Sequence, residues 1–69
     1  MDPIHTRVKN LRLQKNYPQK RVAACLGISQ AAYSKLEAGK NKISIKHLFN
    51  LCECFECSPE LLLGNSKIT

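Results

Sequence analysis

The chain has 69 residues, a formal net charge of +6 and four cysteines. A domain of this size buries only about 60 % of its unfolded surface, which argues against a large enzyme cleft. The sequence has no apolar run near the roughly 18 residues of a membrane span, and its start lacks the basic-then-apolar order of a signal peptide. We therefore expect a single cytoplasmic domain over residues 1–69, with residues 65–69 as a short tail.

Positive charge is concentrated in the first part of the chain. Residues 1–42 contain nine lysines and arginines against two acidic residues, whereas residues 43–69 contain two against three. Interspersed charges would serve solubility equally well, so this asymmetry favours a surface that faces a polyanion such as nucleic acid. The alternative is a basic surface that is only solvated.

The first two of five predicted helices cover the basic region. Residues 3–16 should form an amphipathic helix with Asp2 as its N-cap and Pro3 at its first position. A second, shorter helix should run over residues 18–26 and end at Gly27, because glycine readily takes the left-handed conformation that follows a helix.

The remaining three helices are marked by their capping residues. Ser29 should cap a third helix that runs to Ala38 and ends at Gly39. Ser44 should cap a fourth, which has the widest apolar face, and residues 58–60 should begin a fifth. The apolar positions of the fourth helix are Ile45, Leu48, Phe49, Leu51, Cys52 and Phe55. No alternation typical of strands occurs, so the predicted fold class is all-α.

The second and third helices have the composition of a helix-turn-helix. Two short helices that cross steeply at a tight turn need a small residue at their contact, a turn residue that tolerates positive φ, and apolar residues facing inward. Ala23 and Gly27 meet the first two requirements, and Tyr33 with Leu36 meets the third.

The residues around this turn resemble a known family, the helix-turn-helix domains of phage lambda-type repressors and Cro with their bacterial xenobiotic-response-element relatives. The matching pattern reads Gln19-x3-Ala23-x3-Gly27-Ile28-Ser29-Gln30-x5-Leu36-Glu37-x-Gly39-Lys40. The resemblance implies a compact five-helix, lambda-repressor-like domain whose third helix reads DNA. It also implies that an arginine of the first helix, here Arg12, pairs with Glu37 and orients that third helix.

The outward side of the third helix carries slim and polar side chains suited to the major groove. Gln30 can pair with adenine and Lys35 can donate to guanine, while Ala31 can touch a thymine methyl. Ser34 can bond a base or a phosphate. We expect these four residues to read bases; an ordinary solvated helix face is the alternative.

Phosphate contacts are expected on either side of the recognition helix, from residues that position the domain without reading sequence. They are Gln19, Lys40, Asn41 and Lys42. Pro18 departs from the family pattern, which has Ser or Thr there, and it cannot cap the second helix.

The cysteines are expected to be reduced and structural, since cysteine is readily buried and no secretory signal is visible. A metal site and a thiol sensor are the alternatives for Cys25, Cys52, Cys54 and Cys57. Our expectation is that the protein has no metal and no cofactor.

The predicted function is a small homodimeric repressor or controller that binds double-stranded DNA at a pseudo-palindromic operator. The expected dimer interface consists of Leu61, Leu62, Leu63 and Ile68, although these residues could instead complete the monomer core. The alternative function is an antitoxin-type interaction module that also binds its own promoter. An enzyme is disfavoured, because no catalytic constellation is visible, and neither a membrane nor a small-molecule ligand is expected.

Overall fold

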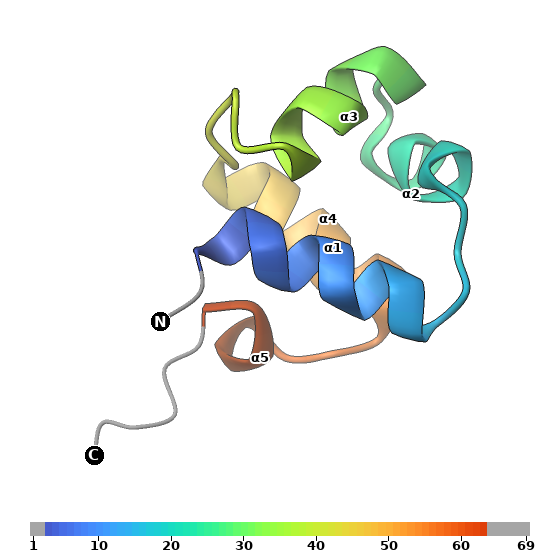
Figure 1. Ribbon diagram of the computed structural model, residues 1–69. Coiled ribbons are helices and arrows are strands. Elements are labelled where there is room, and N and C mark those ends of the chain that lie inside the picture. The colour runs from blue at the N-terminus through green and yellow to red at the C-terminus, as the bar shows by residue number, and fades with distance from the viewer. Residues whose placement is uncertain (1–2, 64–69) are drawn as a thin grey trace.

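A computed structural model of the protein describes residues 3–63, which form five helices and no strand (Figure 1). The predicted all-α class is therefore confirmed. The helices are α1 (Ile4–Gln14), α2 (Gln19–Leu26), α3 (Gln30–Glu37), α4 (Ile45–Phe55) and α5 (Pro59–Leu63). None of the helices in this part of the chain is both long and apolar enough to cross a membrane.

Most helix ends form through the residues that the sequence marked. Ser29 Oγ accepts a hydrogen bond from the amide of Ala32 at 3.0 Å, and Ser44 Oγ caps α4 in the same way. Gly27 and Gly39 end α2 and α3 with φ of 71° and 80°, values that favour glycine over residues with a Cβ.

The first helix is shorter than predicted at both ends. Pro3 occupies the cap position with an extended ψ of 159°, rather than the first helical position. At the other end, Asn16 adopts a left-handed φ of 60°, so the helix stops before it. Asp2, the expected cap, lies outside the described residues.

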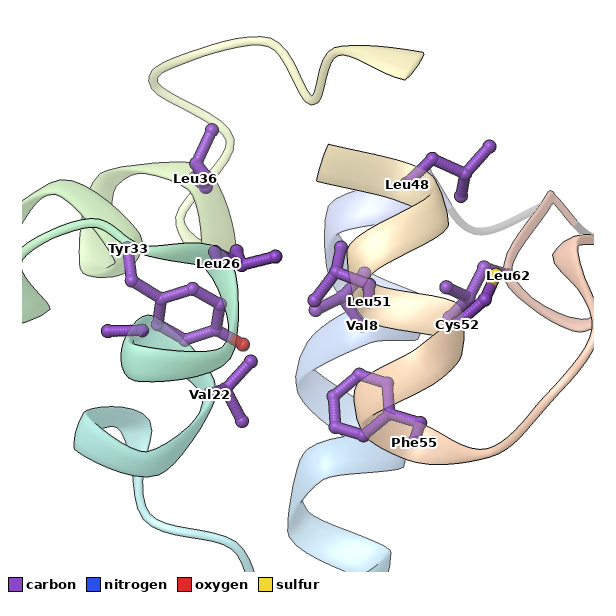
Figure 2. Close-up of a cluster of buried hydrophobic side chains, with 11 residues drawn as sticks. Val8, Val22, Leu26, Tyr33, Leu36, Leu48, Leu51, Cys52, Phe55 and Leu62 are labelled. Carbon is purple, nitrogen blue, oxygen red and sulfur yellow. The ribbon is translucent and has the colours of Figure 1, made fainter. Parts of the chain in front are cut away.

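A single apolar core fills the space between α1, α2, α3 and α4, and α5 closes it against α1 and α4. Figure 2 shows Tyr33 and Val22 approaching this core from one side and Leu51, Phe55 and Val8 from the other. Full burial of one such side chain contributes roughly 1.5–3 kcal/mol. The core therefore fixes how α3 is held on the rest of the domain.

The wide apolar face predicted for the fourth helix is only partly buried. Leu48, Leu51 and Phe55 belong to the core, whereas Ile45 and Phe49 are exposed. Six apolar residues on 11 positions span a wider arc than one line of contact with α1, α2 and α5 can cover.

Candidate nucleic-acid interface

The crossing of α2 and α3 is built as the sequence predicted. Ala23 is buried at the contact, and its carbonyl accepts the amide of Ile28 at 3.1 Å, which tightens the turn around Gly27. From the other helix, Tyr33 and Leu36 pack inward. Because both helices are only eight residues long, this packing and not helix propensity holds them in place.

The opposite side of α3 lies at the edge of the molecule, with no other helix over it (Figure 1). Gln30, Ala31 and Lys35 are exposed, and Ser34 is half-buried. The structure therefore places the four predicted base-reading residues on one accessible face. No acidic side chain of α3 shares it, since the single acid of this helix, Glu37, is buried.

Glu37 is held by a network of four donors. Arg12 reaches its carboxylate through Nε at 2.7 Å and Nη2 at 3.0 Å. The Tyr33 hydroxyl donates to the same group at 2.6 Å, and the Gln19 side-chain amide donates at 3.0 Å. Arg12 also donates through Nη1 to the carbonyl of Tyr17 at 2.8 Å. The ion pair that the resemblance implied is present and joins α1 to α3, and the Gln19 hydrogen bond adds α2.

The network keeps Glu37 ionised although it is buried. Burial alone would raise its pKa, but the hydrogen bonds from Arg12, Tyr33 and Gln19 together lower the pKa below its ordinary value. Burial and the bond to Glu37 raise the pKa of Tyr33 well above its ordinary value, so this phenol stays a neutral donor. The negative charge of α3 is thus neutralised inside the domain.

Sequence reasoning did not predict the parts that Gln19, Tyr33 and Tyr17 take in this network. The four-residue spacing of Tyr33 and Glu37 on one helix was a usable signal, because such pairs are neighbours on a helix surface. Gln19 offered no such signal, since 18 residues separate it from Glu37.

The other predicted phosphate contacts lie in the loop after α3. Lys40, Asn41 and Lys42 are exposed there. The amide of Lys40 donates to the carbonyl of Lys35 at 2.9 Å, which folds the start of the loop back onto the end of α3.

Two further contacts support this surface from outside α3. The His5 ring of α1 packs against Gly39: a Cβ added to the glycine would lie 2.6 Å from His5 Nε2. At α2, Pro18 provides no side-chain cap, as predicted. Beside it, the Arg21 guanidinium lies over the Tyr17 ring, 3.9 Å from the centroid.

The structure corrects one part of the predicted dimer interface. Leu62 is only 1 % exposed because it points into the core of its own domain, so it is not available to a partner. Leu61 and Leu63, its neighbours on α5, are 54 % and 51 % exposed. Ile68 lies outside the described residues.

Comparison with known proteins gives relatives of one kind. A sequence profile of the family described as helix-turn-helix matches residues 8–62. An SPbeta prophage-derived uncharacterized HTH-type transcriptional regulator of Bacillus subtilis (strain 168), YonR, is 39 % identical over 57 residues, 83 % of this chain and 53 % of the relative. The HTH-type transcriptional regulator AnsR of the same organism is 33 % identical over 61 residues, 88 % of this chain and 53 % of that one.

A solved structure shares the fold over nearly the whole chain. The solution structure of the DNA-binding domain of the P22 c2 repressor superposes with a TM-score of 0.82 and 25 % identity, covering 99 % of this chain and 91 % of that one. The chain spans about half the length of the curated relatives it matches. With the matching profile, these similarities show that the chain belongs to the helix-turn-helix family of the phage repressor and Cro type.

Proposed function

We propose that this domain is a sequence-specific DNA-binding transcriptional regulator that inserts α3 into the major groove. The observation that carries the proposal is the outer face of α3, which is exposed, slim and free of acidic side chains because Glu37 is neutralised inside the domain. The names of the two relatives and of the P22 domain support the same function.

Base recognition is assigned to the four residues of that face. Gln30 stands at the first position of α3 and can form two hydrogen bonds with an adenine edge, while Lys35 can donate to guanine. Ala31 leaves room for a thymine methyl, and Ser34 can bond a base or a nearby phosphate. Each good pair discriminates against a wrong base by about 1–3 kcal/mol.

Phosphate contacts should fix the orientation of α3 in the groove. Gln19 is at the N-terminus of α2, where free amides and the helix dipole favour an anion. Its side-chain nitrogen donates one hydrogen to Glu37, and its second N–H can reach a phosphate. Lys40, Asn41 and Lys42 would hold the next phosphate from the loop after α3.

We further propose that the active form is a homodimer joined through α5. Leu61 and Leu63 expose about half of their surface on a five-residue helix, which favours burial against a second copy. A two-fold dimer would place two copies of α3 about 34 Å apart on a pseudo-palindromic site and act as a repressor or controller.

Selection of bound fragments from a random DNA pool tests the proposal. We expect enrichment of one sequence with two-fold symmetry, and Gln30→Ala should then weaken binding to it by about 1–3 kcal/mol and relax the base choice. Gln14→Ala, which removes an exposed glutamine of α1, is the matched control and should bind as the parent does. No enrichment, or equal loss in both variants, would refute base reading by α3.

The dimer is tested separately by sedimentation of the protein with and without operator. Leu61→Ala with Leu63→Ala should lower the dimer fraction, whereas Ile45→Ala, at an exposed position of α4, should not. A parent protein that stays monomeric on its operator would contradict the dimer while leaving base reading intact.

A further inference from the structure

The C-terminal end of α4 brings two cysteines together through its backbone. Glu56 takes a left-handed conformation, φ 56° and ψ 49°, directly after the helix. This turn lets the amide of Cys57 donate to the carbonyl of Cys52 at 3.0 Å. In a helix end of this kind, the side chains of the two bonded residues commonly face one another. Cys52 and Cys57 therefore lie next to each other at this helix end, with their backbones held together by this hydrogen bond.

Both cysteines line the same hollow. It has a volume of about 560 Å³ between α4 and the start of α5, and Phe49 and Pro59 line it together with the two cysteines. Cys52 is buried beside Leu62, as Figure 2 shows, whereas Cys57 is half-buried. Small solutes in the hollow can thus approach the two thiols, Cys57 more readily than Cys52.

The two thiols also interact in the reduced protein. Burial and the neighbouring Cys52 thiol raise the pKa of Cys57. At neutral pH, Cys57 is therefore protonated and reacts slowly, because the thiolate is the nucleophile. Cys25 and Cys54 form a second thiol contact between α2 and α4, but no backbone hydrogen bond fixes their separation.

We propose that Cys52 and Cys57 are a redox pair that hydrogen peroxide converts to an intramolecular disulfide. The more accessible Cys57 sulfur reacts through its small thiolate fraction: it attacks one peroxide oxygen, the O–O bond breaks, and Cys57 becomes a sulfenic acid as one water leaves. The Cys52 sulfur then attacks the Cys57 sulfur and displaces its oxygen as a second water. Two thiols and one peroxide thus give one disulfide and two waters.

The bond would link the last turn of α4 to the segment that begins α5. It would hold the left-handed turn at Glu56. The proposal concerns the end of α4 and the turn that follows it and does not depend on DNA binding, so its test needs no operator.

The test uses the Cys25→Ser/Cys54→Ser protein, in which only the proposed pair remains. After hydrogen peroxide and removal of excess oxidant, we expect both thiols to be lost and the mass to fall by two hydrogens in a monomer that dithiothreitol restores. The further change Cys57→Ser leaves one thiol, and this control should form no internal disulfide. Two free thiols, a disulfide between two chains, or sulfinic acid on either residue would each overturn the proposal.

Peptide mapping of the unchanged oxidised protein provides a test without substitutions, because serine at the half-buried Cys54, which packs against the core, could disturb the fold. A fragment that joins Cys52 to Cys57 is expected. A fragment that joins Cys25 to Cys54, without the first, would assign the oxidation to the other thiol pair and refute the proposal.

Discussion

Removal of the Glu37 carboxylate should cost a large part of the stability of the domain. In Glu37→Ala, the Arg12 side chain, which is only 11 % exposed, stays charged but loses its two hydrogen bonds to the carboxylate, at 2.7 and 3.0 Å. The hydroxyl of Tyr33 loses its acceptor as well. Breaking a buried pair by removing one partner costs about 3–5 kcal/mol. A native domain has roughly 0.05–0.15 kcal/mol per residue, or about 3–10 kcal/mol for this length.

Thermal unfolding followed by circular dichroism measures this loss. At roughly 4–8 °C per kcal/mol for a domain of this size, Tm should fall by at least about 12 °C, or the variant should be unfolded at room temperature. Glu53→Ala makes the same change in net charge at an exposed position of α4 and should melt within a few degrees of the parent. The reasoning fails if Glu37→Ala melts as Glu53→Ala does.

Three other measurements examine neighbouring parts of the interface. Lys40→Ala should weaken binding to all DNA sequences alike and reduce the salt dependence of binding by about one counterion. The control is Lys15→Ala, which removes a lysine near Cys57 and should change the salt dependence less. A loss of affinity confined to the operator would contradict a phosphate contact by Lys40. Gly39→Ala should destabilise the protein through its positive φ and its clash with His5, and part of this cost should vanish when the change is made in the His5→Ala protein. Urea unfolding of the single and double variants measures this, and strictly additive losses of unfolding free energy would contradict the contact. The pKa of Glu37 is lowered in the folded protein, so the stability that its carboxylate contributes is complete at pH values above the ordinary pKa of 4.5. This contribution is lost as the pH falls through the lowered pKa of the folded state. Glu37→Gln should therefore unfold with a shallower acid dependence, and an unchanged acid limb would remove Glu37 as its source.

The network would allow a helix with an acidic residue to approach DNA, as we propose for α3. An exposed carboxylate at the end of α3 would repel phosphate, but Arg12 neutralises the charge of Glu37 inside the domain, and the neutral donors Gln19 and Tyr33 complete its hydrogen bonding. The same contacts tie α3 to α1 and α2. Charge neutralisation and helix orientation therefore depend on the same few side chains.

Local features of the sequence sufficed to predict the helices and the outward face of α3. Ser29, Ser44, Gly27 and Gly39 act on amides or dihedrals within a few residues of themselves, so their roles can be read along the chain. The pairing of Arg12 with Glu37 came from the family resemblance, because 25 residues separate them and no periodicity connects them.

Other features were decided only by the tertiary structure. Which leucine of α5 turns inward depends on how that helix lies against α1 and α4, and this packing buries Leu62 while leaving Leu61 and Leu63 exposed. Gln19 joins Glu37 across 18 residues, and His5 meets Gly39 because α1 lies against α3. The sequence by itself determined which residues lie on the outward face of α3, because caps and helical periodicity act locally. Only the packed core decided which side chains hold that surface in place, because those contacts join residues far apart in the chain.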